Sequence, residues 1–371
     1  MKLKVLIIHD SMKGGGAERV LSTLLNNLDY KRFDVTLLLL YKEGVFLRSL
    51  PADVKVVGLC GSSTTLKERI ITHFYGIRNY IRLRRAKKVL GDSSFDVTVS
   101  FMEGPTAKLH QQLTRVSAKN LSWIHSDIKT CRWYNFWFKK SEECEFYENV
   151  DGVAFVSEGA KKSFCDVISS KAELKVIYNP VDVNGIRKQA GAENKAEHKT
   201  FTIVNVGRLV PPKNQMRLLE IARILKLRGL DFKVKILGDG QLEQELKAAA
   251  KNFGLESTVD FLGYVENPYP VVKEADLFCL TSDHEGFGMV VAESLALGVP
   301  VVSTPVLGVS EILSHGGGII ASFDPMLMAD IIEDLMMNPD KLHELKSQTE
   351  QSVAQFDLDN IIKSVESFFE K

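Results

Sequence analysis

The sequence has no long apolar run and no recognisable export signal. Among its 371 residues, no segment reaches the roughly 18 consecutive apolar residues that a membrane-spanning helix needs. The opening stretch, MKLKVLIIHD, contains too short an apolar run for a signal peptide, and no small-residue cleavage site follows it. These absences predict a cytoplasmic protein.

Cysteine is scarce, and neither sign of charge predominates. The 5 cysteines are scattered and form no Cys-x-x-Cys pair, which argues against a disulfide framework and a zinc site. Lys+Arg and Asp+Glu are equal at 47 each, so general affinity for nucleic acid is not expected. No cluster of His, Asp and Glu has the spacing of metal ligands, and neither a P-loop nor a nucleophile elbow is present. We therefore expect neither a bound metal nor a cofactor.

The chain consists mainly of buried-strand patterns that alternate with amphipathic helices. About seven apolar runs precede residue 180, from VLIIHD near the N-terminus to LKVIYNP. The alternation resumes at FTIVNVG and continues through FKVKILGDG, TVDFLG, DLFCLTS, VPVVST and GGIIAS. Continuous apolar runs between helices are typical of a parallel sheet covered on both faces. The predicted fold class is therefore α/β, with two Rossmann-like domains that face each other across a cleft.

A polar stretch separates the two series of strands. The sequence IRKQAGAENKAEHKT, within residues 183–200, has almost no large apolar residues and is typical of a linker. We predict an N-terminal domain over residues 1–182 and a C-terminal domain over residues 201–355, followed by an amphipathic helix over residues 356–371. In open sheets of this kind, ligands bind outside the carboxyl ends of the strands.

The stretch DHEGFGMVVAESLALGVPVVS, residues 283–303, follows one of these strands directly. The helix expected to begin near Gly288 would direct its free N–H groups toward an anion such as phosphate. Glu293, one turn into that helix, can reach back toward the same ligand. An acceptor-only carboxylate suits the vicinal diol of ribose, and Glu285 in the loop would hold other hydroxyls. Each acid alone would be an ordinary surface residue, but the combined context favours a binding site.

A second strand end carries two cations. Arg208 and Lys213 lie in the loop GRLVPPKN, which begins at Gly207 and follows the run FTIVNV. An arginine fork and a lysine point charge could clamp a diphosphate and stabilise the charge that builds on a leaving phosphate. Two solvated loop cations are the alternative. Gly238, at a further strand end, is expected to line the nucleotide.

Two features of the first domain are further candidates for this site. The loop KGGGAER lets a backbone amide at Gly15 or Gly16 approach a phosphate, although Arg19 occupies the third glycine position of a dinucleotide fingerprint. A tight turn without a ligand is the alternative. His125 ends the run KNLSWIH at a strand's carboxyl end, facing the expected cleft. A purely structural histidine is the alternative there.

One helix is strongly basic. The stretch RNYIRLRRAKK, from Arg78 to Lys88, carries 6 basic residues and no acid. In a chain without net charge, this concentration suggests contact with the anionic head groups of a membrane surface. A solvated basic helix face is the alternative, and an RNA-binding role lacks any accompanying nucleic-acid fold signature.

These motifs resemble those of the retaining nucleotide-sugar glycosyltransferases of family 4, which have the two-domain GT-B fold. The spacing of Glu285 and Glu293 matches that family's E-x7-E motif. VGRLVPPKN, GGGAER and WIHSD are similar to its Arg/Lys phosphate loop, its N-terminal Gly loop and its His loop. The resemblance covers nearly the whole chain. One departure is Asn214, which stands where a Gly often follows the Lys.

The resemblance implies a role for each candidate residue. Arg208 and Lys213 would bind the donor diphosphate. Glu293 would hold the ribose and Glu285 the donor sugar, with His125 near the transferred sugar. Backbone amides of the turn before the helix would also touch the donor, namely those of Gly286, Phe287, Gly288 and Met289. The resemblance further implies that no metal takes part and that the C-terminal helix packs on the N-terminal domain.

The expected activity is therefore sugar transfer with retention of configuration. The donor is a nucleoside-diphosphate sugar, with UDP as the favoured nucleotide, and the transferred group is a hexose or an N-acetylhexosamine. The acceptor is a hydroxyl of a growing, lipid-linked glycan at the inner face of the cell membrane, which would use the basic stretch. KGGGAERV and IHSD look most like enzymes that build bacterial surface polysaccharides such as capsule or lipopolysaccharide. A sugar-nucleotide epimerase of the same architecture is the alternative, and a non-catalytic nucleotide-sugar binder is a third.

Overall fold

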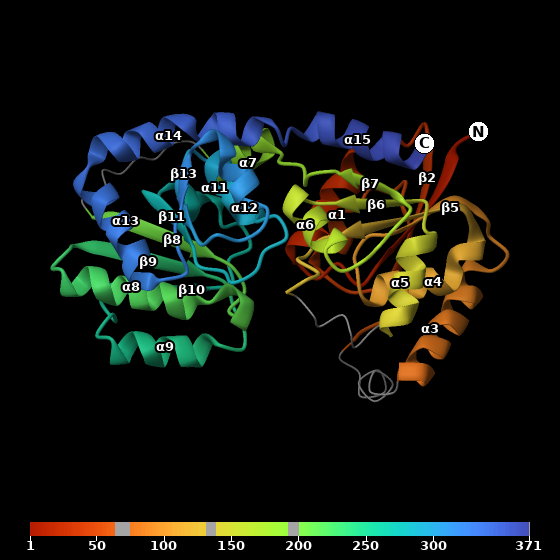
Figure 1. Cartoon of the computed structure of the whole chain (residues 1–371), viewed down its shortest axis with the longest axis horizontal. Coiled ribbons are helices and arrows are strands. Elements are labelled where there is room, and N and C mark those ends of the chain that lie inside the picture. Colours follow the sequence, from red (N-terminus) through yellow and green to blue (C-terminus); the bar gives the residue numbers. More distant parts are fainter. Residues whose placement is uncertain (64–74, 131–138, 192–199, 371) are drawn as a thin grey trace. The chain divides into compact units, whose positions relative to one another are not determined.

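The computed structural model describes residues 1–63, 75–130, 139–191 and 200–370. The chain divides into two compact units (Figure 1): unit 1 is Met1–Pro180 with Asp359–Lys371, and unit 2 is Val181–Leu358. Each unit is built on its own parallel sheet. The predicted α/β class with two such domains is confirmed, while a cleft between the domains stays a prediction.

Unit 1 contains a 7-stranded sheet in the order β3-β2-β1-β4-β5-β6-β7, in which every neighbouring pair is parallel. Its strands are β1 (Leu3–His9), β2 (Phe33–Tyr41), β3 (Lys55–Cys60), β4 (Phe95–Ser100), β5 (Ser117–Ile124), β6 (Gly152–Phe155) and β7 (Glu173–Val176). Residues Val5 to His9 of the central strand β1 are all buried, which explains the unbroken apolar run from Val5 to Ile8.

Helices cover both faces of this sheet. They are α1 (Gly16–Asn27), α3 (Tyr75–Leu90), α4 (Pro105–Leu113), α5 (Lys140–Asn149), α6 (Glu158–Cys165) and α15 (Leu358–Glu370). A cluster of buried apolar residues, which includes Leu6 and Ile8, joins α3 and α4 to β1 and β2. α15 lies on the opposite side of the sheet from α3 and α4 (Figure 1).

The C-terminal helix α15 is held on unit 1 by polar contacts. Glu366, only 7% exposed, accepts the backbone N–H of Asp29 at 3.0 Å and pairs with Arg32 at 2.5 Å. Lys119 Nζ donates to the carbonyl of Phe368 at 2.7 Å, near the helix C-terminus, where a cation is favourable.

The start of α15 differs from the prediction. The expected helix began at residue 356, whereas α15 begins at Leu358 and unit 1 resumes at Asp359. The reason is that Phe356 is fully buried in unit 2, where its ring packs edge-to-face on Phe287 with centroids 5.1 Å apart.

A buried histidine gives unit 1 a pH-dependent stability. His110 of α4 is fully buried, and its ring nitrogens lie 3.1 Å from Ser100 Oγ and 3.0 Å from Asn120 Oδ1. Burial lowers its pKa to about 4, against a partial rise from the Asn120 contact. The native state therefore keeps His110 neutral, whereas the unfolded chain protonates it below a pKa of about 6.5.

We predict that His110→Gln removes part of the acid sensitivity. Because the folded pKa is depressed, the His110 contribution is present above the unfolded pKa and is lost as pH falls toward 4. The difference in free energy of unfolding between wild type and variant should therefore shrink by about 3 kcal/mol between pH 7 and pH 4. Urea unfolding across this range measures it, and a pH-independent difference would contradict it.

Unit 2 contains a 6-stranded sheet in the order β10-β9-β8-β11-β12-β13, again parallel throughout. Its strands are β8 (Phe201–Val206), β9 (Phe232–Leu237), β10 (Val259–Gly263), β11 (Leu277–Leu280), β12 (Val301–Ser303) and β13 (Gly318–Ile320). β8, the first of these strands in the chain, lies inside the sheet between β9 and β11. The order of strands therefore reverses between β8 and β11.

The helices of unit 2 pack on both faces of its sheet. They are α7 (Val183–Ala190), α8 (Gln215–Leu227), α9 (Glu243–Asn252), α10 (Tyr269–Lys273), α11 (Met289–Ala296), α12 (Val309–Ile312), α13 (Pro325–Met337) and α14 (Pro339–Ala354). α8, α9 and α13 share one apolar cluster, while α11 packs against α7 and α14. Among the residues that the structure describes, no helix has both the length and the apolarity to cross a membrane.

The predicted linker over residues 183–200 is partly wrong. Its first half is α7, which belongs to unit 2. The side chain of Asp182 caps this helix by accepting the N–H of Gly185 at 2.8 Å, and Ile186 and Ala190 are buried. Only two apolar residues in the stretch are needed for this packing, so composition alone suggested a linker. Residues 192–199 lie outside the described residues.

Candidate functional site

In unit 2, the candidate residues gather where the order of strands reverses. Arg208 and Lys213 follow β8, and Glu285 follows β11, which is hydrogen-bonded to β8. Loops at the carboxyl ends of two strands at such a switch point enclose the usual ligand crevice of an open α/β sheet. The topology thus brings together two cations and a carboxylate that are about 75 residues apart in sequence.

Glycines of the neighbouring loop give the Arg208 segment its position. Gly238 has a φ of 133°, and a Cβ there would lie 2.0 Å from the carbonyl oxygen of Gly207. The N–H of Leu209 donates to the carbonyl of Asp239 at 2.7 Å. Gly238 therefore supports the loop that carries Arg208 and Lys213 through close backbone contact. The expected contact of Gly238 with a nucleotide stays a prediction.

Asn214 replaces the glycine that often follows the lysine without changing the turn. Its φ of 44° and ψ of 52° are left-handed, a conformation that Asn tolerates better than most residues. Its side chain also caps α8, because Oδ1 accepts the N–H of Arg217 at 3.3 Å. Asn214 thus supplies both the turn and the start of the helix.

Lys213 and Glu285 form an ion pair in unit 2. Lys213 Nζ lies 2.5 Å from Glu285 Oε1, and the hydroxyl of Ser282 donates to the same oxygen at 2.7 Å. The side chains are 24% and 11% exposed, so the pair is largely shielded from water. Arg208 is exposed, and among the described residues its side chain has no hydrogen bond or ion pair.

The turn before α11 is shaped by two glycines and anchored by an aromatic ring. Gly288 has a φ of 95° at the start of α11, and a Cβ on Gly308 would lie 2.5 Å from Cα of Phe287. The Phe287 side chain is 3% exposed and packs in the core. Only its backbone is therefore left for the expected donor contact, which stays a prediction. Glu293, 6% exposed, lies one turn into the helix.

In unit 1, the candidate residues also follow central strands. Gly15 caps α1 and Gly16 is its first residue, in the connection after β1. His125 directly follows β5, with its ring centroid 4.7 Å from that of Phe101 and stacked on Trp123 at 6.2 Å. Burial, and then the charge of His9, lower the pKa of His125 to about 3, so its ring is neutral.

Sequence reasoning missed Glu103, which holds the His125 segment. Its fully buried carboxylate accepts the backbone N–H of His125 at 2.9 Å and the hydroxyl of Ser126. Burial raises the pKa of Glu103, and these hydrogen bonds oppose the rise. The available signal was its position: β4 ends just before it, and Gly104-Pro105 then begins α4.

The predicted residues therefore fall into two sets. Unit 1 contributes Gly15, Gly16 and His125, and unit 2 contributes Gly207, Arg208, Lys213, Gly238, Glu285, Gly286, Phe287, Gly288, Met289 and Glu293. In the described parts of the chain, no three His, Cys, Asp or Glu side chains are grouped as a metal site would require. A reaction without metal or cofactor stays a prediction.

Comparison with known proteins gives consistent matches. The family model described as "Glycosyl transferases group 1" matches residues 187–352. A Campylobacter jejuni enzyme, N-acetylgalactosamine-N,N'-diacetylbacillosaminyl-diphospho-undecaprenol 4-alpha-N-acetylgalactosaminyltransferase, is 30% identical over 81% of this chain and 80% of its own length. A second enzyme of that organism, an alpha-1,4-N-acetyl-D-galactosaminyltransferase acting on a diNAcBac-PP-undecaprenol glycan, is 27% identical over 97% of this chain and 96% of its own.

Solved structures share the fold. Anabaena HepE in complex with UDP-glucose superposes with a TM-score of 0.78 at 20% identity, over 99% of each chain. Sucrose-phosphate synthase from Thermosynechococcus elongatus gives a TM-score of 0.80 at 15% identity, over 100% of this chain and 98% of its own. At these identities, the similarity extends to the fold alone.

Proposed function

This chain belongs to the group 1 glycosyl transferases and is a glycosyltransferase, and from that premise we propose its substrates. The donor is a nucleoside-diphosphate sugar, with UDP as the nucleotide, and the reaction retains the configuration of the sugar. The acceptor is a hydroxyl of a lipid-linked glycan. The comparisons give the epimerase alternative no support.

One observation carries this proposal. Arg208 and Lys213 follow β8 beside the Glu285 loop after β11, at the switch point of unit 2. The forked guanidinium of Arg208 and the ammonium of Lys213 suit a diphosphate. The neighbouring carboxylate of Glu285 suits the hydroxyls of the attached sugar. The complexes of HepE with UDP and UDP-glucose, and the undecaprenol-linked acceptors of the two Campylobacter enzymes, support these substrate classes.

The proposed chemistry needs no protein nucleophile. The bond between the anomeric carbon and the diphosphate oxygen breaks while the acceptor oxygen bonds to that carbon on the same face. The acceptor proton moves to the departing phosphate. Arg208 and Lys213 stabilise the charge that develops on the leaving diphosphate, which is where preorganised cations have their largest effect. The neutral ring of His125 stays near the transferred sugar in this proposal.

A thermal-shift panel of nucleotide sugars tests the donor. A ligand present at about 100 times its Kd stabilises the folded state by about 2.7 kcal/mol. The UDP-sugar that is used should raise the melting temperature, and the corresponding GDP-sugar should not. Incubating that donor with a polyprenyl-diphosphate-linked saccharide should then give UDP and an extended glycan whose new linkage keeps the donor's configuration. Isomerisation of the donor without acceptor would instead identify an epimerase.

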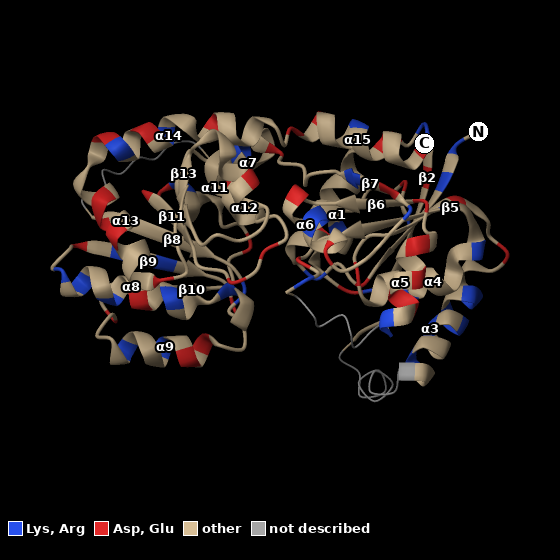
Figure 2. Ribbon diagram, viewed as in Figure 1, with Lys and Arg blue, Asp and Glu red and all other residues tan. Residues whose placement is uncertain are grey.

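The basic helix α3 is proposed to contact an anionic membrane surface on the inner face of the cell membrane. Lys and Arg residues recur along α3 (Figure 2). However, Arg78 and Arg82 are buried, and Arg82 donates to Tyr41 Oη at 2.9 Å. The expected surface role of the whole Arg78–Lys88 stretch is therefore wrong for these two residues, because their side chains face the interior of unit 1.

The exposed basic residues of α3 give a testable surface. Arg84, Lys87 and Lys88 are exposed, on a helix whose Ile77 and Tyr80 are also 55% and 63% exposed. Each cation near an anionic bilayer contributes about 1 kcal/mol, so replacing all three with glutamine should weaken vesicle binding about a hundredfold.

Co-sedimentation with vesicles containing phosphatidylglycerol measures this loss. A matched control carries glutamine at three exposed cations of unit 2, Arg223, Lys226 and Lys251, and should bind as the wild type does. Equal losses in both triple variants would show a general charge effect and remove α3 from the proposal.

A further inference from the structure

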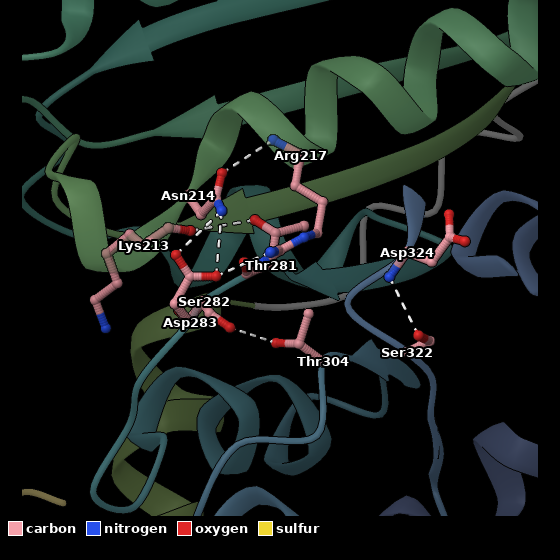
Figure 3. A network of polar contacts seen from close by, with 9 residues as sticks. All are labelled: Lys213, Asn214, Arg217, Thr281, Ser282, Asp283, Thr304, Ser322 and Asp324. Carbon is pink, nitrogen blue, oxygen red and sulfur yellow. Dashed lines mark hydrogen bonds and ion pairs between the residues drawn. The ribbon is translucent and has the colours of Figure 1, made fainter. Parts of the chain in front are cut away.

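The two loops of the unit 2 site, one after β8 and one after β11, are joined through the first turn of α8. Asp283, in the Glu285 loop, accepts hydrogen bonds from Asn214 Nδ2 at 3.1 Å and from Arg217 Nη2 at 2.9 Å. Both donors lie on or next to α8, which directly follows Lys213. Figure 3 shows the side chains of Asn214 and Arg217 directed at the carboxylate of Asp283.

Further contacts bind the same two loops. Arg217 Nη1 donates to the carbonyl of Thr281, and the backbone N–H of Asp283 donates to the carbonyl of Pro212 at 2.8 Å. The hydroxyl of Thr281 donates to the carbonyl of Lys213 at 3.3 Å. Arg217 thus contacts the β11 loop with both terminal nitrogens, although it belongs to the helix after the β8 loop.

The Arg208 segment is tied to the same helix turn. Gln215, the first residue of α8, is 1% exposed and donates from Nε2 to the carbonyl of Arg208 at 3.2 Å. The start of α8 therefore contacts the segments that carry Arg208, Lys213 and Glu285. It therefore joins the three segments of unit 2 whose side chains are proposed to contact the diphosphate and the attached sugar.

The Arg217–Asp283 pair is partly shielded, with side-chain exposures of 12% and 36%. A shielded ion pair resists separation, because moving one partner away leaves a poorly solvated charge. Its additional hydrogen bonds also fix its geometry, so the pair restricts the positions of the two loops that it joins. The Lys213–Glu285 ion pair is held in place by the loops that this contact joins. Fixing these loops in advance reduces the ordering that a ligand must impose when it binds.

We propose that Arg217, through Asp283, is a positioning residue for the diphosphate part of the donor. It sets the distance between the loops that carry Lys213 and Glu285, and it does not itself touch the substrate. Loss of Arg217 should therefore weaken interactions with the phosphates and leave the nucleoside contacts unchanged. This inference rests on the proposed function, since it concerns the same donor site.

The ratio of UDP affinity to uridine affinity tests the proposal. We expect Arg217→Met to weaken UDP about tenfold or more in calorimetry and to change uridine less than twofold in ligand-observed NMR. Arg217→Lys retains the positive charge but not the forked guanidinium. Its UDP affinity should therefore lie between those of the wild type and Arg217→Met. A merely structural role would weaken both ligands by the same factor or neither, and either result would overturn the proposal.

Two further variants keep the result interpretable. Arg223→Met removes an exposed arginine of the same helix, whose guanidinium lies 5.0 Å from the ring centre of Phe253, and should leave both affinities unchanged. Should Arg217→Met not fold, Asp283→Asn tests the same contact with nearly the same side-chain volume. It should lower UDP affinity alone, and unchanged UDP affinity in that variant would also overturn the proposal. A wild type that binds no UDP would refute the proposed function instead.

Discussion

Replacing Arg208 with alanine is expected to lower kcat for sugar transfer by a factor of about 10² to 10³. A preorganised cation at the departing diphosphate stabilises the transition state more than the ground state, so its loss appears mainly in kcat. The Arg208 side chain is exposed and has no ion pair among the described residues, so its removal should hardly change stability. Steady-state transfer assays and thermal melting of the same preparations measure the two effects.

Two controls accompany this variant. Arg208→Lys keeps the charge and loses the bidentate fork, and it should retain more activity than the alanine variant. Arg223→Ala removes an exposed arginine from α8, outside the site, and should have wild-type kinetics. Turnover within about twofold of the wild type in Arg208→Ala would show that Arg208 does not act on the leaving group.

Lys213 and Glu285 are expected to be strongly non-additive. Lys213→Met and Glu285→Gln should each lower kcat/KM by about 10² or more, because a phosphate contact and a sugar contact are lost. In Lys213→Met, the Glu285 carboxylate, which is only 11% exposed, loses its ion-pair partner. It would then lie beside the anionic diphosphate and repel it. Glu285→Gln removes that repulsion.

The double variant decides this second prediction. The kcat/KM of the double variant, Lys213→Met with Glu285→Gln, should be at most about tenfold below that of the less active single variant. This combined loss is well short of the product of the two single losses. A complete double-mutant cycle for kcat/KM is the measurement. Fully multiplicative losses would show that the two residues act independently on the donor, and that their ion pair has no part in the reaction.

The strands and the site loops were predictable because their signals are local. VLIIHD and FTIVNV are short apolar runs, each followed by a loop that contains glycine, and both became central strands, β1 and β8. Strand ends in such sheets lie at one edge, so Arg208, Lys213 and Glu285 could be assigned to one site from sequence order. Asn214 could be recognised as the departure from a Gly, although only the structure shows its left-handed backbone.

The supporting residues were not predictable because their partners are distant in sequence. Glu103 binds the His125 segment 22 residues away, and Arg217 contacts Asp283 66 residues away. A pattern of apolar residues places Arg217 on a helix but does not show which loop it meets. In α3, the basic pattern gave no sign that Arg78 and Arg82 face inward, since their burial depends on neighbours such as Tyr41.

A crystal structure of the full chain with UDP tests the central claim most directly. We expect the diphosphate between Arg208 and Lys213 at the carboxyl ends of β8 and β11, with Lys213 Nζ turned from Glu285 toward a phosphate oxygen. The ribose should lie within hydrogen-bond reach of Glu293. UDP bound at any other place in unit 2, or a diphosphate that contacts neither cation, would contradict it.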